Sequence, residues 1–416
     1  MILKVRGKRK LNGTVRISGS KNSAVAIIPA AILCDENVVI RNIPDIKDVR
    51  TLLEILEEQG YSILFENNVL KISTVEKPSV IYKSSKVAKL RGSTYLMGAT
   101  IGKYHKTTIK YFGGCNLGER PIDYHLAGFK KLNIKIKETN DFLVLKTRKI
   151  KSAVIDLKFP SVGATINLVL ASVKCCGEVK INNAAIEPEV VDVCNFLVSM
   201  GAIINGIGTK NLQIFGVKSL HSTDYTIISD RIEAGTYLIL GSLATGEGVT
   251  VENLNYEHLT SLINVLQEIG LKLTVESDKI TIKNDGNLIP YNLKTGVYPN
   301  FPTDLGPLIS ILFTQIEGES SIEETIFSNR FSHVSELIKM NANILLSNNT
   351  LKVSGGNPLK PANVECKDLR GAASLVLAST LTKGYTYINN IDVLFRGYEN
   401  PLDKLTSLGL KVELIE

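Results

Sequence analysis

The stretch SDRIEAGT, residues 229–236, places a polar turn directly before the start of an apolar helix that contains Ala and Gly. Ser and Asp in front of an apolar run are typical of helix N-caps. The same turn and helix start recur at an interval of about 70 residues, which indicates an internal repeat. The five related stretches are GSKNSA (19–24), LRGSTY (90–95), PSVGAT (160–165), NFPTDLGP (300–307) and KDLRGAAS (367–374).

A second set of residues, one from each repeat, recurs with the same period of about 70 residues. Six helical patterns end in Gly or Asn, and an apolar strand pattern follows each of them. Gly and Asn accept the left-handed conformation that often ends a helix. These predicted helix stops are Gly60, Asn133, Gly201, Gly270, Asn341 and Gly409.

Each repeat therefore reads as a βαβαββ unit, and the predicted fold class is α/β with six such units. A chain of 416 residues is long enough for two domains, and three units per domain is the natural division. We expect each domain to bury its first helices and to turn its sheets outward.

Composition and charge restrict the classes of function. Lys and Arg number 48 against 41 Asp and Glu, a formal charge of +7 that is spread along the chain. Nucleic-acid binding proteins show a stronger and more clustered excess, so small anionic substrates fit this balance better. Because no signal peptide or membrane-spanning run is visible, we expect a cytoplasmic protein, a monomer or weak oligomer, with no nucleic-acid or membrane partner.

The chain contains six cysteines, whose spacing matches neither a disulfide framework nor a zinc site. No metal-ligand set is visible, and we expect no metal and no resident cofactor. Five cysteines stand among apolar residues and are predicted to fill the core: Cys34, Cys175, Cys176, Cys194 and Cys366.

Cys115 lies in a different setting, the segment GGCNLGERP at 113–121. Three glycines and a proline predict a loop, and such loops can close over a substrate. A thiol beside Arg120 has more thiolate character than a core cysteine. The alternative is a surface cysteine without function, but exposed free cysteines are a liability.

The repeated turns carry the residues that suggest chemistry. A helix N-terminus attracts anions through its free N–H groups and its dipole, so threefold packing of these turns predicts an anion site. The alternative is a set of solvated turn residues paired with nearby acids. The residues in this column are Lys21, Arg91, Ser161, Arg231, Asp304 and Arg370.

Nine blocks in order carry a resemblance to a known family. They are SGSKNSA (18–24), GGCNLGERPIDYHL (113–126), FPSVGAT (159–165), NNAAIEPEVVD (182–192), DRIEAGT (230–236), YPNFPTD (298–304), NRFSHVSEL (329–337), KDLRGAA (367–373) and RGYENPLDKL (396–405). With them the chain resembles the UDP-N-acetylglucosamine 1-carboxyvinyltransferases, the enolpyruvyltransferases that begin bacterial peptidoglycan synthesis.

The resemblance implies two inside-out α/β barrels with a cleft between them. One domain would comprise 21–229, and the other 1–20 plus 230–416. The reaction would move enolpyruvate from phosphoenolpyruvate to the 3′-hydroxyl of UDP-N-acetylglucosamine and release phosphate, by addition and then elimination. The two reactants would be the partners of this chain.

The resemblance also assigns roles to residues. Cys115 would be the general acid and could add covalently to phosphoenolpyruvate, Asp304 would accept the proton of the hydroxyl group, and Lys21 would be catalytic. The residues for phosphoenolpyruvate would be Lys21, Asn22, Arg120 and Arg396. Those for the nucleotide sugar would be Arg91, Arg120, Pro121, Ile122, Asp123, Tyr124, Ser161, Val162, Asp304 and Ile326. The charged lining would be completed by Glu187, Arg330, Asp368 and Arg370.

Some positions depart from the family pattern. Ile186 replaces a basic residue, and Leu305-Gly306-Pro307 stands where the family has a Gln-containing stretch. Because these changes flank the site, they leave the acceptor open. The alternatives are an enolpyruvyltransferase for shikimate 3-phosphate or another nucleotide, and a non-catalytic regulatory relative. The shikimate family lacks the cysteine loop, and a pure binder needs no acid or base.

Overall fold

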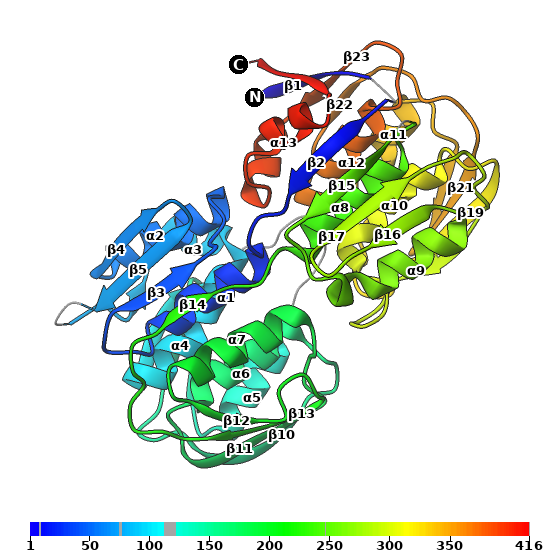
Figure 1. The fold of residues 1–416 in the computed structure, drawn as a ribbon. Helices are drawn as coiled ribbons and strands as arrows, with labels where there is room; N and C mark the ends of the chain where they lie inside the picture. The colour runs from blue at the N-terminus through cyan, green and yellow to red at the C-terminus, as the bar shows by residue number, and fades with distance from the viewer. Residues whose placement is uncertain (8–9, 75–76, 112–121, 246, 416) are drawn as a thin grey trace. The chain divides into compact units, whose positions relative to one another are not determined.

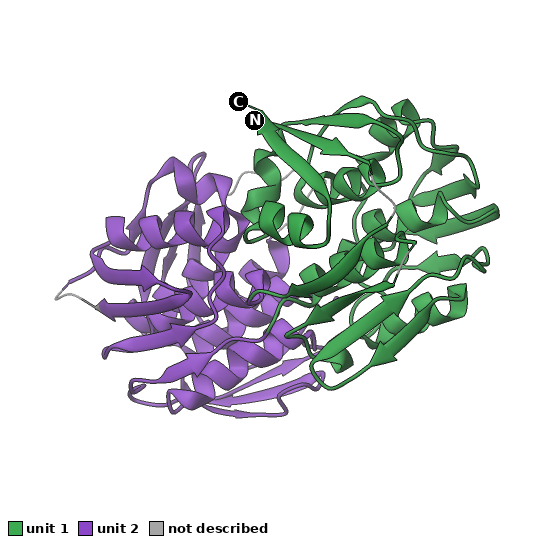
Figure 2. Ribbon diagram, turned by 45° about the horizontal axis from the view of Figure 1, so that its top comes forward, with its two compact units in different colours: residues 1–18, 115–118, 229–416 green, residues 19–114, 119–228 purple. Residues whose placement is uncertain are grey.

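The computed structural model describes residues 1–7, 10–74, 77–111, 122–245 and 247–415. Within them the chain divides into two compact units, shown in Figure 2. Of the described residues, those in 1–18 and 229–416 form unit 1, and those from 19 to 228 form unit 2. The division proposed from the sequence sets its boundaries at slightly different positions. No helix among the described residues is both long and apolar enough to span a membrane.

Each unit holds three βαβαββ repeats, which confirms the predicted fold class (Figure 1). The first helix of a repeat is buried along nearly its whole length, as in α1, where every residue from Ser23 to Ala31 is buried. These helices are α1 (Lys21–Ala31), α4 (Tyr95–Tyr104), α6 (Val162–Ser172), α8 (Arg231–Ser242), α10 (Gly306–Phe313) and α12 (Leu369–Ser379).

The second helix of each repeat buries one face only, as the spacing of buried residues in α2 shows. These helices are α2 (Lys47–Glu58), α5 (Asp123–Lys131), α7 (Pro188–Ser199), α9 (Thr260–Ile269), α11 (Val334–Lys339) and α13 (Pro401–Ser407). Short helical segments complete the set: α3 (Ser85–Lys89), η1 (Arg91–Thr94), η2 (Tyr256–Leu259), η3 (Thr303–Leu305) and η4 (Ile391–Arg396).

Every repeat contributes a four-stranded sheet in which the first two strands are parallel and the last two antiparallel. In unit 2 the sheets are β14 (Asp224–Thr226), β3 (Val38–Arg41), β5 (Val69–Thr74), β4 (Tyr61–Glu66); β6 (Ile81–Tyr82), β7 (Lys106–Lys110), β9 (Phe142–Lys146), β8 (Lys135–Glu138); and β10 (Lys151–Asp156), β11 (Cys176–Asn182), β13 (Asn211–Phe215), β12 (Ile203–Asn205). In unit 1 they are β2 (Asn12–Arg16), β15 (Gly248–Glu252), β17 (Lys279–Lys283), β16 (Lys272–Val275); β18 (Asn292–Lys294), β19 (Gly318–Glu323), β21 (Thr350–Gly355), β20 (Ile344–Ser347); and β22 (Asn363–Glu365), β23 (Tyr385–Asn389), β1 (Ile2–Arg6), β24 (Lys411–Ile415).

Two strands are exchanged between repeats. Strand β2 precedes α1 in sequence but pairs with β15, and β14 precedes α8 but pairs with β3. Strand β1 lies between β23 and β24, so the N-terminal strand is the third member of a sheet whose other strands come from the last repeat. The chain therefore passes from unit 1 into unit 2 after residue 18 and returns after residue 228.

The left-handed helix stops are confirmed at all six predicted positions: Gly60, Asn133, Gly201, Gly270, Asn341 and Gly409 have φ values of 95°, 67°, 96°, 110°, 72° and 90°. The buried helices also approach closely where glycine allows it. A Cβ added to Gly98 of α4 would lie 2.4 Å from the carbonyl oxygen of Asn167 in α6.

One prediction about the cysteines is wrong. Cys34, Cys175, Cys194 and Cys366 are buried, as expected for core residues, but Cys176 is exposed. Cys176 is the first residue of β11 and directly follows the buried Cys175. Adjacent residues at a strand point to opposite faces, so both members of a Cys-Cys pair cannot face the core.

Candidate active site

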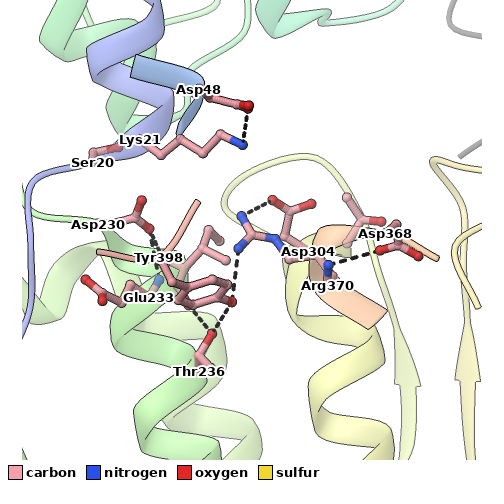
Figure 3. A network of polar contacts seen from close by, with 12 residues as sticks. Ser20, Lys21, Asp48, Asp230, Glu233, Thr236, Asp304, Asp368, Arg370 and Tyr398 are labelled. Atoms are coloured by element: carbon pink, nitrogen blue, oxygen red, sulfur yellow. Dashed lines mark hydrogen bonds and ion pairs between the residues drawn. The ribbon is translucent and has the colours of Figure 1, made fainter. Parts of the chain in front are cut away.

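A group of charged side chains in unit 1 surrounds Asp304, which lies in η3 just before α10. Its Oδ2 accepts a hydrogen bond of 2.9 Å from Arg370 Nη2 (Figure 3). Its Oδ1 pairs with Arg330. The side chain of Arg330 is 1% exposed, whereas that of Asp304 is 27% exposed. Two guanidinium groups therefore stabilise the Asp304 carboxylate as an anion whose outer side remains accessible.

A directed chain of hydrogen bonds orients Arg370. Thr236 donates its hydroxyl hydrogen to the Ile232 carbonyl over 2.8 Å and contacts the Tyr398 hydroxyl group at 2.9 Å. Tyr398 must then donate to Thr236, and its oxygen accepts from Arg370 Nη1 at 3.1 Å. Figure 3 shows this chain beside Asp304.

The electrostatic surroundings keep Arg370 charged. Burial by itself lowers the pKa of this group, but Asp304 and Tyr398 outweigh burial and raise the pKa above its ordinary value. The Arg370 fork therefore offers a fixed pattern of donors next to Asp304.

Asp368 supports the same cluster from the start of α12. Its Oδ1 accepts the backbone N–H groups of Arg370 and Gly371, both at 3.0 Å, and its Oδ2 accepts from the Ser332 hydroxyl group. An Asp at this position is a strong N-cap. Asp368 thus fixes the helix turn that carries Arg370.

Two further residues that the family resemblance assigns to the site lie in unit 1. Arg396 is the last residue of η4, two positions before Tyr398. Ile326 follows β19, and its backbone N–H donates to Glu324 Oε1 over 2.7 Å. Arg231, the fourth member of the repeated turn, is the first residue of α8 and stacks on the ring of Tyr298 at 5.5 Å.

Lys21 occupies the corresponding place in unit 2. It is the first residue of α1, whose N-cap Ser20 accepts from the Ser23 N–H group. Lys21 Nζ lies 2.8 Å from Asp48 Oδ2, and the two side chains are 15% and 10% exposed. Asn22 follows in the first turn. A cation at a helix N-terminus is locally unfavourable, and Asp48 offsets this charge.

The predicted nucleotide-sugar residues of unit 2 stand at the starts of two neighbouring helices. Ser161 caps α6 by accepting from the Ala164 N–H group at 3.3 Å, and Val162 is the first helical residue. Ile122 precedes α5, Asp123 begins it, and Tyr124 packs against the core of unit 2 together with Ile122 and Val162.

His125 of α5 contacts Asn167 of α6 and so connects the two helices. Its Nδ1 lies 3.0 Å from Asn167 Nδ2, and Asn167 Oδ1 accepts the Gly98 N–H group at 2.8 Å. Because that contact fixes the amide, Asn167 donates to His125, and the imidazole proton sits on Nε2. Burial, with a smaller contribution from the nearby Arg91, lowers the pKa of His125 to about 3.

Because the pKa of His125 is lowered in the folded protein, we expect the stability of the fold to depend on pH. The ordinary pKa of 6.5 falls to about 3 on folding, so the unfolded chain binds more protons between these values. Stability is therefore lost as the pH falls through this window. In His125→Asn the amide oxygen can accept the Asn167 bond without titrating, so we expect a smaller loss of stability between about pH 7 and about pH 4.5 than in the wild type. Urea unfolding at both pH values measures the difference, and equal losses would refute the assignment.

The remaining predicted residues are placed as follows. Arg91 is the first residue of η1, not of the α-helix itself, which begins four residues later at Tyr95. Glu187 directly precedes α7 and is 9% exposed. Cys115, Arg120 and Pro121 lie outside the described residues.

The sequence reasoning missed several polar residues that support the site. Tyr398 belongs to the block RGYENPLDKL, but nothing in its spacing indicates a bond to Arg370. Glu324 precedes Ile326 and resembles an ordinary strand-end acid, although it is 2% exposed. In the sequence, Glu324 is unusual only when the repeats are aligned, because four of them have Asn at the corresponding position.

The chain is similar in sequence to proteins that are described as carboxyvinyltransferases. The profile of the family described as EPSP synthase (3-phosphoshikimate 1-carboxyvinyltransferase) matches residues 5–405. A Listeria monocytogenes protein named UDP-N-acetylglucosamine 1-carboxyvinyltransferase 2 is 43% identical over 408 residues, 98% of this chain and 96% of that protein. A Bacillus cereus protein of the same name is 43% identical over 411 residues, 99% of this chain and 96% of its own length.

Solved structures share the fold. The enolpyruvyl transferase NikO from Streptomyces tendae aligns with a TM-score of 0.90 at 24% identity, covering 99% of this chain and 98% of that one. EPSP synthase from Acinetobacter baumannii aligns with a TM-score of 0.78 at 17% identity over the full length of both chains.

Proposed function

Because the chain belongs to the EPSP synthase family of enolpyruvyltransferases, we propose that it transfers enolpyruvate from phosphoenolpyruvate to the 3′-hydroxyl group of UDP-N-acetylglucosamine. The products are phosphate and the enolpyruvyl nucleotide sugar, and the step begins peptidoglycan synthesis in the cytoplasm. The observation that carries the proposal is 43% identity over 98% of the chain to a relative named for this activity.

The polar groups of the two units suit the chemistry of an addition followed by an elimination. In the addition, the sugar oxygen bonds to C2 of phosphoenolpyruvate, its proton passes to Asp304, and a proton from Cys115 reaches the methylene carbon. In the elimination, the new methyl group returns a proton to the Cys115 thiolate, the C–H electron pair forms the C=C bond, and the C2–O bond to phosphate breaks. Asp304 is supported in this role by its charged, part-exposed carboxylate.

The anionic co-substrate needs cations. Lys21 and Asn22 stand in the first turn of α1, where free N–H groups and an ammonium group favour a phosphate. With Arg120 and Arg396 we assign them to phosphoenolpyruvate. Arg91, Ser161 and Ile326 are assigned to the nucleotide sugar, with no metal or resident cofactor in the reaction.

The acceptor is tested by phosphate release. Purified protein with phosphoenolpyruvate is given UDP-N-acetylglucosamine, shikimate 3-phosphate or a nucleotide without the sugar. We expect release only with the nucleotide sugar, and mass spectrometry should show the enolpyruvyl product. Release with shikimate 3-phosphate alone would favour the rival acceptor. Binding of both reactants without release would favour a regulatory relative.

Cys115 provides an independent test. We expect fosfomycin to add covalently to the Cys115 thiol when nucleotide sugar is present, because the thiolate opens its epoxide ring. Cys115→Asp should keep turnover, since a carboxylic acid can still donate the proton, but should form no adduct. The exposed thiol of Cys176 serves as the control, and Cys176→Ser should leave the adduct unchanged. Complete loss of turnover in Cys115→Asp would require another acid.

A further inference from the structure

A repeated asparagine fixes the end of the second strand in four of the repeats. In each, the residue after the strand is Asn with a left-handed φ, and its side-chain amide donates to the carbonyl of the residue after the first strand. The pairs are Asn42 with Ile227 at 3.1 Å, Asn183 with Leu157 at 2.8 Å, Asn253 with Ile17 at 2.7 Å, and Asn390 with Cys366 at 2.9 Å.

The fifth repeat departs from this rule at the place where Asn would stand. Glu324 follows β19, just as Asn253 follows β15. In this repeat Thr325, the residue after Glu324, makes the hydrogen bond that Asn makes in those four repeats. Its Oγ1 donates to the carbonyl of Thr295, the residue after the first strand, over 2.9 Å. The Glu324 carboxylate is therefore not needed to connect the two strands.

Glu324 instead accepts four hydrogen bonds in a buried setting. Its Oε2 accepts the hydroxyl groups of Thr295 at 3.0 Å and Thr303 at 2.8 Å. Its Oε1 accepts the backbone N–H groups of Ile326 at 2.7 Å and Phe327 at 3.0 Å. One side chain thus connects the segment that carries Ile326 with the turn that carries Asp304.

The contact at Thr303 extends to the charged cluster. Thr303 precedes Asp304, and its carbonyl and hydroxyl oxygens accept from Arg330 Nε at 2.9 Å and 3.1 Å. Arg330 in turn pairs with Asp304. The position of the Asp304 carboxylate therefore depends on a Thr303 hydroxyl group whose hydrogen is directed to Glu324.

We propose that Glu324 is a positioning residue for the acceptor half of the reaction, which sets the Asp304 carboxylate and the Ile326 segment in register with each other. This role rests on the proposed function, because it assumes that Asp304 takes the hydroxyl proton and that Ile326 contacts the nucleotide sugar. A displaced base slows proton transfer, and a displaced Ile326 segment weakens binding of the sugar.

Glu324→Gln tests this role with little change of shape. The amide keeps one acceptor oxygen but turns a donor group toward the two Thr hydroxyl groups or the two N–H groups. We expect kcat to fall about 10- to 100-fold and the KM for UDP-N-acetylglucosamine to rise about 10-fold, while the KM for phosphoenolpyruvate stays within about 2-fold. Steady-state phosphate release with each substrate varied gives all three values.

Glu336→Gln is the matched control. Glu336 is a 3% exposed carboxylate of the same unit that accepts the Glu365 N–H group at 3.1 Å, and it has no assigned role in the reaction. Glu324→Gln kinetics equal to those of Glu336→Gln would overturn the proposal. Equal rises in both KM values together with a lowered melting temperature would also overturn it, because they indicate a structural role only.

A second pair of variants isolates the Thr303 link and serves if Glu324→Gln does not fold. Thr303→Val removes the hydroxyl group and should lower kcat about 10-fold, whereas Thr303→Ser keeps it and should stay within about 2-fold of the wild type. Equal kcat values for the two variants would overturn the link. A wild-type protein that is inactive with UDP-N-acetylglucosamine would instead refute the proposed function, and the positioning role with it.

Discussion

Lys21→Ala is expected to lower phosphate release by about 10³-fold or more, which makes it one of the two most damaging substitutions in this chain. Lys21 supplies the ammonium group at the start of α1, next to N–H groups that have no partner within the helix. In the elimination the phosphate leaves with the bridging oxygen, and the negative charge that develops on this oxygen as the C–O bond breaks is stabilised by the ammonium group. The rate of phosphate release at saturating substrates measures the effect.

Two controls separate this chemical role from a loss of stability. Lys21→Ala leaves Asp48, 10% exposed in the native pair, without its 2.8 Å ammonium partner, so some stability should be lost. Lys21→Ala combined with Asp48→Asn removes both charges and should recover stability without recovering turnover. Lys86→Ala removes an exposed lysine that pairs with Glu54 at 2.8 Å and should keep full activity. Unchanged kinetics in Lys21→Ala would exclude Lys21 from the site.

Asp304→Asn should also lower kcat by about 10³-fold, because an amide cannot accept the proton of the sugar hydroxyl group. The amide in addition places a donor against Arg330 or Arg370, which both now donate to the carboxylate. The KM for phosphoenolpyruvate should change only a few-fold. Single-turnover measurements with both substrates bound will show whether the addition step itself is slowed.

The control for Asp304 is another carboxylate of unit 1 that pairs with a cation. Asp285 forms an ion pair of 2.7 Å with Lys272, whose side chain is 75% exposed, and Asp285→Asn should leave kcat unchanged. Asp304→Glu retains the carboxylate but moves it by one methylene group, and its rate should lie between those of the wild type and Asp304→Asn. Retained kcat in Asp304→Asn would remove the base assignment.

The repeat could be predicted because its signals are local. Gly270 and Asn341 are residues that favour a left-handed stop, and Ser161 and Asp230 are residues that favour an N-cap, whatever lies around them. Chain order then places Lys21, Asp304 and Arg370 at helix starts.

The contacts around those residues could not be predicted in the same way. Arg330 and Arg370 are 26 and 66 positions from Asp304 in sequence, and Tyr398 lies 162 positions from Thr236. Such pairs depend on how three repeats pack around each other, which no local pattern specifies. Glu324 could not be predicted for another reason. It stands where four other repeats have an Asn that connects their first two strands, and the role of that Asn is seen only in the three-dimensional structure.

The strand exchange imposes an order on folding during synthesis. Residues 19–228 contain all three sheets of unit 2, including β14, and Ser20 N–H bonds to the Ile228 carbonyl at 2.8 Å, so this unit can close once residue 228 is made. Strand β1, made first, must wait for β23 and β24, and β2 must wait for β15. The nascent chain therefore carries two unpaired N-terminal strands beside a finished domain, and a ribosome-stalled intermediate should expose them to chaperones or proteases.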